Sequence, residues 1–256
     1  MRVLVTGHKG FIGGRIFRHL AKEGYDVKGF DVGDQFPDER FDAIIHMAAR
    51  GLIRESVKAP YDYFLDDLVL AVKFLEKSRI DRSIFVFPSS GSAQLPTNPY
   101  SVSKKQAAEW IALYRKLYST EGYVLRFFNI YGEESRKGAV YLFLKAAISS
   151  QVATVYGDGT HARDYTYVGD VEKVVGLILK GKLEPGEHEV GTGVGTSTMQ
   201  LLRLAERITG KRVNFQFAPY ALEEADELIA KKPMLPDPTP LEEGMRRVAK
   251  SLMENP

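Results

Sequence analysis

The sequence has 256 residues, enough for one large domain or for a two-lobed protein with a sizeable core. Its 35 basic and 33 acidic residues give a net charge of +2, which does not favour binding to nucleic acid or to an anionic membrane. It contains no cysteine, which excludes disulfides and thiol catalysis, and its five histidines lack the spacing of metal ligands. We therefore expect a soluble cytoplasmic protein with no metal, no nucleic-acid partner, no membrane contact and no leader peptide.

The first half of the sequence alternates short β-branched runs with amphipathic stretches, which is typical of βαβ units and a parallel sheet. We expect strands at Arg2–Thr6, Asp26–Phe30, Ala43–His46, Ser83–Pro88, Gly122–Phe127 and Glu187–Val190. We expect helices at Gly13–Lys22, Pro60–Ser78, Tyr100–Leu117, Val140–Ser149, Asp170–Lys180, Ser197–Thr209 and Leu241–Met253, the last after a linker with Pro233, Pro236, Pro238 and Pro240. The alternation weakens after about residue 130. The pattern predicts an α/β fold with a doubly wound parallel sheet and a smaller lobe built by the later residues.

A glycine-rich turn connects the first expected strand to the first expected helix. Gly7 permits a tight turn, Gly10 lets the backbone approach a pyrophosphate, and Gly13 lets the helix pack close to the strand. Asp31 ends the second strand, where a carboxylate accepts ribose hydroxyls and repels a 2′-phosphate. Lys9 instead favours NADP, because a cation in this turn could reach such a phosphate. The turn predicts NAD rather than NADP, bound by Gly7, Lys9, Gly10, Phe11, Ile12, Gly13 and Asp31.

A serine, a tyrosine and a lysine follow in a pattern that suits proton transfer. Tyr100 and Lys104 are four positions apart, so they lie on one face of a helix, one turn apart. A nearby ammonium and a positive nicotinamide ring both favour the phenolate, which lowers the pKa of the tyrosine towards the working range. Ser89 and Ser90 end an apolar strand, where a hydroxyl can hydrogen-bond the substrate oxygen that loses its proton.

With these motifs, the sequence resembles the extended short-chain dehydrogenase/reductase family, and within it the nucleotide-sugar epimerases and dehydratases. The resemblance also covers residues 46–49, 55–57, 89–92, 125–132, 157–159, 163–165 and 167–171. It implies a Rossmann-type NAD-binding domain of residues 1–132 plus about 165–192, and a C-terminal substrate-binding lobe of about 133–164 plus 193–256.

The resemblance also assigns roles to single residues. Tyr100 would be the general base, Lys104 its electrostatic partner and Ser90 the ligand of the substrate oxygen. Asn129 and Arg163 would hold the diphosphate of a nucleotide-sugar substrate, a role that suits an arginine fork. Further cofactor contacts would come from Met47, Ala48, Ala49, Asp67, Ser89, Tyr100 and Lys104.

Several positions depart from the family pattern. Asp67 stands where the family usually has an asparagine, and Glu133 replaces a usual proline. The connections from Asp31 to Ile44 and from Ser90 to Tyr100 are shorter than usual, which trims the rim of the pocket. A second phosphate-binding arginine has no match in the segment 219–226, which leaves the hold on a nucleotide diphosphate incomplete.

The residues after Ser90 exclude one of the reactions known in the family. The dehydratases of the family carry an Asp-Glu pair there, whereas this sequence has Gly91 and Ser92, which cannot do acid–base work. The resemblance therefore implies NAD-dependent 4-epimerisation of a UDP-hexose through a transient 4-keto sugar. Two alternatives stay open: an NAD(P)-dependent sugar dehydrogenase or 4-keto-sugar reductase, and a non-catalytic NAD-binding sensor.

Two amphipathic helices concern the oligomeric state of the protein. Their apolar positions are Phe64, Leu68, Ala71, Val72 and Leu75 in one helix and Ala107, Ala108, Ile111, Tyr114 and Leu117 in the other. Such stripes usually pack on the sheet. Relatives pair these two helices with those of a second subunit, so the resemblance implies a homodimer held by a four-helix bundle.

Overall fold

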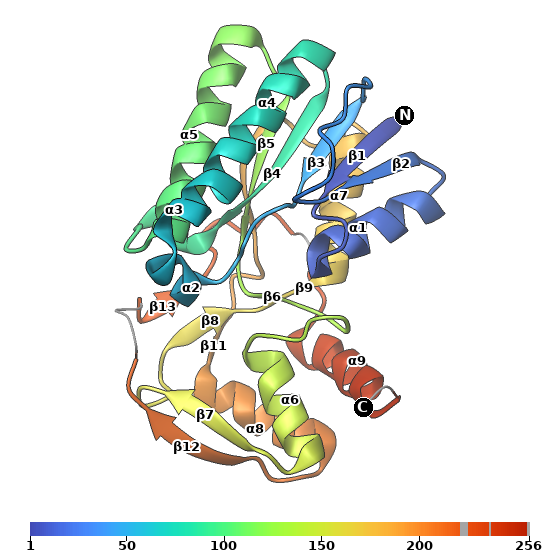
Figure 1. The fold of residues 1–256 in the computed structure, drawn as a ribbon. Coiled ribbons are helices and arrows are strands. Elements are labelled where there is room, and N and C mark those ends of the chain that lie inside the picture. Colours follow the sequence, from blue (N-terminus) through green and yellow to red (C-terminus); the bar gives the residue numbers. More distant parts are fainter. Residues whose placement is uncertain (221–224, 236, 255–256) are drawn as a thin grey trace. The chain divides into compact units, whose positions relative to one another are not determined.

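The computed structural model describes residues 1–220, 225–235 and 237–254, and the chain divides into two compact units (Figure 1). One unit comprises Met1–Phe127 and Val171–His188, and the other comprises Phe128–Asp170 and Glu189–Pro256. Each unit is therefore built from segments that are far apart in the sequence. Pro236 of the expected linker, and residues 221–224 of the segment searched for a second arginine, lie outside the described residues.

The first unit contains a six-stranded sheet in the order β10-β5-β4-β3-β1-β2, which confirms the predicted α/β class. Its strands are β1 (Arg2–Thr6), β2 (Asp26–Phe30), β3 (Ala43–His46), β4 (Ile84–Ser90), β5 (Gly122–Phe127) and β10 (Gly186–Val190). The pairs of β1 with β2 and β3, of β3 with β4 and of β4 with β5 are parallel. Because β1 lies between β2 and β3, the strand order reverses beside the glycine-rich turn, where open α/β sheets bind ligands.

Helices cover both faces of this sheet, with α4 and α5 on one face and α1 and α7 on the other (Figure 1). Their bounds are α1 (Phe11–Lys22), α2 (Ile53–Lys58), α3 (Pro60–Tyr63), the π-helical segment η1 (Phe64–Val69), α4 (Leu70–Asp81), the 3₁₀ turn η2 (Gly91–Gln94), α5 (Pro99–Tyr118) and α7 (Val168–Leu179). Among the described residues, no helix is long and apolar enough to cross a membrane.

The expected single helix Pro60–Ser78 is wrong in its middle, because the π-helical segment η1 interrupts it. A π turn accommodates one extra residue, and it turns the two neighbours Asp67 and Leu68 inwards together. An ordinary amphipathic pattern rarely buries a carboxylate beside a leucine. The sequence pattern therefore could not reveal this local change of helix type.

The core of the first unit explains which apolar positions stay exposed. Leu68, Ala71, Leu75, Ala107 and Ile111 are buried against the sheet. The stripes named in the sequence analysis are thus mainly the core-facing sides of their helices. The exposed apolar side chains of η1, α4 and α5 are Phe64, Leu65, Val69, Ile80, Val102, Trp110, Leu113, Leu117 and Tyr118.

The described residues of the second unit form short strands and the helices α6, α8 and α9. Its elements are β6 (Ile130–Tyr131), α6 (Ala139–Ser149), β7 (Val152–Tyr156), β8 (Ala162–Asp164), β9 (Thr166–Tyr167), β11 (Gly195–Ser197), α8 (Thr198–Thr209), β12 (Asn214–Ala218), β13 (Glu227–Leu228) and α9 (Leu241–Glu254). Small sheets form between β11, β8 and β13, between β12 and β7, and between β6 and β9. Sequence analysis missed all these strands, because most are too short for a period-two pattern to appear.

Candidate functional site

The glycine-rich turn has the geometry that its sequence predicts. Gly7 has a φ of +68°, and a Cβ there would lie 2.7 Å from the backbone nitrogen of Ala48. A Cβ on Gly13 would lie 2.2 Å from the carbonyl oxygen of Gly7, so the helix can approach the strand only without a side chain. A Cβ on Gly10 would meet only the Gly7 oxygen, at 3.2 Å. The turn is therefore tight at both ends and roomier at its centre.

The start of α1 suits a pyrophosphate. Gly10 is the N-cap, no side chain caps the helix, and its first turn carries no acidic residue. The N–H groups at Phe11 and Ile12 and the positive end of the helix dipole can therefore serve an anion. These residues fit the phosphates of a dinucleotide.

The carboxylate of Asp31 is held at the end of β2 by the backbone. Its Oδ2 accepts from the N–H of Lys9 at 3.1 Å and its Oδ1 from the N–H of Val32 at 3.0 Å. The ammonium of Lys9 lies 3.5 Å from Oδ1 of Asp34, whose other oxygen accepts from the N–H of Asp31 at 2.7 Å. Lys9, considered above as a ligand for a 2′-phosphate, is thus paired with a second carboxylate. Two carboxylates and one ammonium favour a ribose diol over a phosphate.

The end of β3 is tied to the end of β1. The hydroxyl of Thr6 lies 2.9 Å from Nδ1 of His46 and accepts from the N–H of Ala48 at 3.1 Å. The N–H of Met47 donates to the carbonyl of Thr6 at 3.2 Å. Burial, with a smaller effect from Lys104, lowers the pKa of His46 to about 3, so this imidazole stays neutral. The segment of Met47, Ala48 and Ala49 is held beside Gly7 by these contacts.

The two serines at the end of β4 differ in their surroundings. β4 extends to Ser90, so both serines belong to the strand rather than following it. Ser89 is buried, and its hydroxyl has no partner among the described residues. The hydroxyl of Ser90 accepts from the N–H of Ser92 at 3.3 Å, and a hydrogen bond between Ser90 and Tyr100 lowers the tyrosine pKa. The structure thus brings Ser90, rather than Ser89, to Tyr100.

The first turn of α5 fixes the position of Tyr100. Asn98 caps the helix by accepting from the N–H of Ser101 at 3.0 Å, and the Ser101 hydroxyl accepts in return from the N–H of Asn98 at 3.3 Å. Pro99 occupies the first helical position, where its missing N–H costs nothing. This capping box places Tyr100 in an ordered turn one residue after the proline.

Lys104 lies one turn after Tyr100 and is buried. Its Nζ is 4.7 Å from the centre of the Phe87 ring and 5.8 Å from the centre of the Tyr100 ring. Burial lowers the pKa of Lys104, while the charge of Asp67 acts in the opposite direction. The lysine nitrogen therefore lies in a largely aromatic environment, where burial favours the neutral amine and the charge of Asp67 favours the ammonium.

The expected lowering of the Tyr100 pKa is not what the protein alone produces. Desolvation, and then the negative charge of Asp67, raise the pKa of Tyr100 to about 12. Sequence reasoning weighed the lysine and left out both the cost of burying a phenolate and the neighbouring carboxylate. A further positive charge at the site is needed to favour the phenolate.

Arg50 is a polar neighbour of the site that sequence analysis did not single out. Its backbone N–H donates to Oδ1 of Asp67 at 2.9 Å. Its guanidinium pairs with Asp66 at 2.7 Å and with Asp62 at 3.5 Å. Its place directly after the segment 46–49 was the available signal, because that segment lies at the carboxyl end of a strand.

The predicted substrate ligands Asn129 and Arg163 belong to the second unit. Asn129 adopts a φ of +33°, and its Nδ2 donates to the carbonyl of Asp164 at 3.1 Å. The guanidinium of Arg163 donates to the carbonyl of Ala162 at 3.0 Å and to that of Asp226 at 3.3 Å. The two residues are therefore linked through β8, while Ser90, Tyr100 and Lys104 lie together in the first unit.

Asp164, the neighbour of Arg163 in β8, is hydrogen-bonded to two other segments of the second unit. It is fully buried, and its carboxylate accepts from the N–H and hydroxyl of Thr192, at 3.0 and 2.6 Å, from the N–H of Gly193 at 2.9 Å and from that of Ala230 at 3.2 Å. Sequence analysis placed Asp164 only in the segment 163–165 and gave it no role of its own. Its carboxylate oxygens instead accept hydrogen bonds that hold the loops after β10 and β13 beside β8.

We expect Asp164→Asn to destabilise the protein by at least about 3 kcal/mol, because an amide NH₂ would face N–H donors that then lose their acceptor. Urea denaturation measures this change. Asp158→Asn is the matched control, because that carboxylate is exposed and accepts from the N–H and hydroxyl of Thr160, and the change should cost less than about 1 kcal/mol. Equal costs for the two variants would contradict the role given to Asp164.

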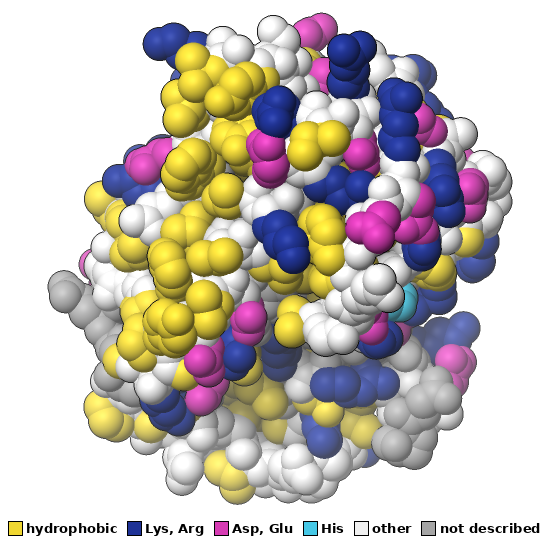
Figure 2. Space-filling view, turned by 45° about the horizontal axis from the view of Figure 1, so that its top comes forward, with side chains coloured by type: hydrophobic (Ala, Val, Ile, Leu, Met, Phe, Trp, Pro, Cys, Tyr) yellow, Lys and Arg dark blue, Asp and Glu magenta, His cyan; other side chains and the backbone are white. Residues whose placement is uncertain are grey.

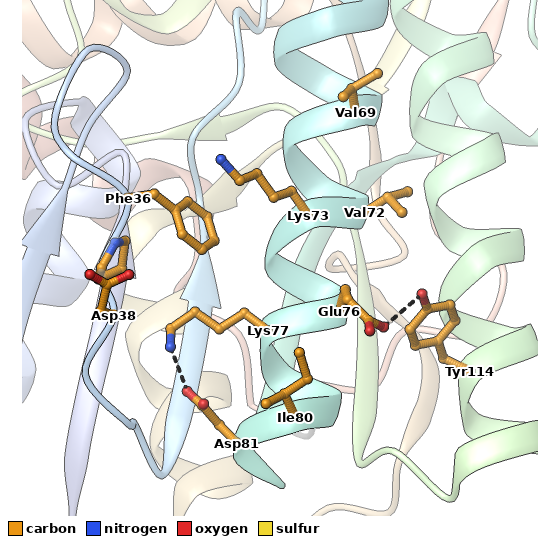
Figure 3. Close-up of a pocket in the computed structure, with 11 residues that line it drawn as sticks. Phe36, Asp38, Val69, Val72, Lys73, Glu76, Lys77, Ile80, Asp81 and Tyr114 are labelled. Carbon is orange, nitrogen blue, oxygen red and sulfur yellow. Dashed lines mark hydrogen bonds and ion pairs between the residues drawn. The ribbon is translucent and has the colours of Figure 1, made fainter.

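A surface hollow of about 660 Å³ lies beside α4 (Figure 3). Phe36, Val69, Val72 and Tyr114 contribute to its lining, and Lys73 lies with its Nζ 4.0 Å from the centre of the Phe36 ring. No residue of the predicted cofactor or catalytic site lines it. The hollow is therefore separate from the site built above.

Several known proteins are similar to this chain in sequence and in fold. A family model described as the NAD dependent epimerase/dehydratase family matches residues 3–191. A putative UDP-glucose 4-epimerase of Methanocaldococcus jannaschii is 31% identical over 257 residues, covering 82% of this chain and 83% of that protein. The UDP-glucose 4-epimerase of Lactobacillus helveticus is 28% identical, covering 90% and 88%. The structure of Thermus thermophilus UDP-glucose 4-epimerase in complex with NAD has a TM-score of 0.87 and 26% identity, and all of both chains is covered.

Proposed function

Because this chain belongs to the NAD-dependent epimerase/dehydratase family, we propose that it epimerises a UDP-hexose at C4 through a transient 4-keto sugar. The observation that carries the proposal is the cluster in which the partly buried Ser90 hydrogen-bonds the partly buried Tyr100, one helical turn from the buried Lys104. The residues after Ser90, Gly91 and Ser92, offer no acid–base pair for dehydration.

In this proposal each residue of the cluster has one task. Tyr100, as phenolate, takes the proton of the C4 hydroxyl and gives it back to the epimerised oxygen. Ser90 hydrogen-bonds the same oxygen, and the ammonium of Lys104 favours the phenolate. NAD, which the turn Gly7–Gly13 and Asp31 would hold, would supply a reversible acceptor for the hydride of C4. Asn129 and Arg163 would hold the diphosphate of the nucleotide.

The cofactor specificity follows from the end of β2. Asp31 would accept the ribose hydroxyls, and Asp34 engages the ammonium of Lys9 and adds negative charge. A 2′-phosphate would meet two carboxylates and a cation already paired, so NAD is favoured over NADP.

A cytoplasmic location stays a prediction from the absence of cysteine.

The direct test of the function is to identify the released nucleotide and the products. The purified protein is denatured and the nucleotide that comes off is identified. UDP-glucose and UDP-galactose are then added separately, and both sugar nucleotides and the absorbance of reduced cofactor are followed. Bound NAD and interconversion without net reduction support the proposal. Stoichiometric reduced cofactor would show a dehydrogenase instead, and bound NAD with no turnover would show a sensor.

We also propose that the chain forms a homodimer through α4 and α5. Figure 2 shows hydrophobic side chains gathered in a band over the face of these helices. On α5, Val102, Trp110, Leu113 and Leu117 recur at helical spacing and are 39% to 58% exposed. Exposed contiguous apolar patches on soluble proteins commonly mark interfaces. This stripe, which shares only Leu117 with the mainly core-facing one predicted from sequence, would contact the partner.

We expect Leu113→Glu to convert the dimer to a monomer, because a two-fold interface would bring two buried carboxylates together. Light scattering after gel filtration measures the mass. Leu142→Glu on α6 is the matched control, because Leu142 is also exposed, at 54%, but lies in the second unit. A wild-type protein that is monomeric at micromolar concentration would overturn the proposal.

A further inference from the structure

The buried carboxylate of Asp67 is not used by the mechanism above. Asp67 is fully buried in the π-helical segment η1, and its Oδ1 accepts from the N–H of Arg50 at 2.9 Å. Its Oδ2 is also buried and has no hydrogen-bond partner among the described residues. A buried carboxylate with one oxygen unsatisfied needs a compensating positive charge.

Among the charged and titratable groups around Asp67, Lys104 is the buried cation that can supply this positive charge. On the loop before α2, the guanidinium of Arg50 is half-exposed and pairs with Asp66 and Asp62. On α3, the hydroxyl of Tyr63 donates to the carbonyl of Leu52 at 2.6 Å, so it too is engaged elsewhere.

On α5, Lys104 is buried and makes no hydrogen bond with Asp67, so the two charges act on each other at longer range. Burial raises the pKa of Asp67, and the charge of Lys104 lowers it. Tyr100 is the other titratable group of α5 that faces Asp67. On β3, His46 is neutral and adds no charge. An ammonium held between the rings of Phe87 and Tyr100 is itself costly without a counter-charge.

We propose that Asp67 is the counter-ion of Lys104, and that this buried charge pair, rather than Lys104 alone, sets the charge against which Tyr100 loses its proton. The inference deepens the proposed function and rests on it for the role of Tyr100. Asp67 is then a positioning residue that acts through Lys104. It explains why a carboxylate can occupy a place where the family usually has an asparagine.

The net charge of Asp67, Lys104 and Tyr100 determines how readily Tyr100 loses its proton. With Asp67 ionised, Lys104 protonated and Tyr100 neutral, the cluster carries no net charge, and loss of a proton from Tyr100 leaves a buried negative charge. With asparagine at position 67 the cluster begins at +1, and loss of a proton makes it neutral. The carboxylate therefore holds the proton on Tyr100 until another positive charge, such as the ring of oxidised NAD, is present.

The first test is the pH dependence of kcat/KM. Asp67→Asn should lower the apparent pKa of the acid limb by at least about one unit, because a negative charge that disfavours the phenolate is gone. Asp66→Asn is the matched control, because the neighbouring carboxylate pairs with Arg50 at the surface, and it should shift that pKa by less than about 0.3 unit. An unchanged acid limb in Asp67→Asn would overturn the proposal.

The second test needs neither cofactor nor substrate. Lys104→Met alone strands the buried carboxylate and should lower Tm by roughly 10 °C. The double variant Asp67→Asn with Lys104→Met should recover most of that loss. Additive losses in this double-mutant cycle would rule out an interaction between the charges of Asp67 and Lys104. If the wild-type protein acts on no nucleotide sugar, the proposed function fails, while the cycle still decides the pairing of Asp67 with Lys104.

Discussion

Replacing Tyr100 with phenylalanine should lower kcat by about 1,000-fold and leave bound NAD in place. The change removes only the hydroxyl that accepts the proton, and a positioned general base contributes roughly 10²–10⁴-fold to a rate. The ring still packs edge-on against Tyr63, with 6.5 Å between ring centres, so the helix start should keep its structure. Steady-state kinetics and the nucleotide content after denaturation measure the two effects.

Tyr63→Phe is the control for this variant. It removes the hydroxyl that donates to the Leu52 carbonyl, close to Tyr100 but without a role in proton transfer. It should change kcat by less than about tenfold. Turnover near the wild-type rate in Tyr100→Phe would mean that another group is the base.

Gly13→Ala should reduce NAD affinity by at least about 100-fold and lower the stability of the protein. The added Cβ would lie 2.2 Å from the carbonyl oxygen of Gly7, which is backbone and cannot move aside as a side chain can. Relief of the clash would push the start of α1 away from β1 and would open the turn that receives the pyrophosphate. Fluorescence titration with NAD and thermal denaturation measure the two losses.

The control is Gly176→Ala in α7, where nothing lies within 4 Å of the added Cβ. Alanine favours a helix over glycine by about 1 kcal/mol, so this variant should be neutral or slightly more stable. The comparison separates the clash from the general effect of replacing a helical glycine. An unaltered NAD affinity in Gly13→Ala would contradict the role given to this turn.

The parallel sheet and the turn at Gly7–Gly13 could be predicted from the sequence because each signal is local. Runs such as Ile84–Phe87 form strands wherever they are covered on both faces, and the glycines stand directly at a strand end. The same locality placed Tyr100 and Lys104 on one face of α5. The comparisons confirm the family that these motifs indicated.

Contacts between distant residues could not be predicted in this way. The raised pKa of Tyr100 depends on Asp67, which a π turn buries against α5, and no pattern in residues 60–78 announces that turn. The groups that donate hydrogen bonds to the Asp164 carboxylate lie in loops that follow it by about 30 and 65 residues, at Thr192 and Ala230. Helical periodicity also identified mainly the core side of α5, together with the exposed Leu117. It missed the exposed Val102, Trp110 and Leu113, because both stripes recur at the same spacing.

The central claim is that hydride leaves C4 of a UDP-hexose and returns to the same carbon without leaving the protein. The most direct measurement uses UDP-glucose deuterated at C4 and follows the deuterium content of the UDP-galactose formed. The proposal predicts that the product keeps its deuterium at C4 and that no deuterium appears in free reduced cofactor. Loss of deuterium to solvent, or its release as free deuterated cofactor, would contradict the proposed epimerisation.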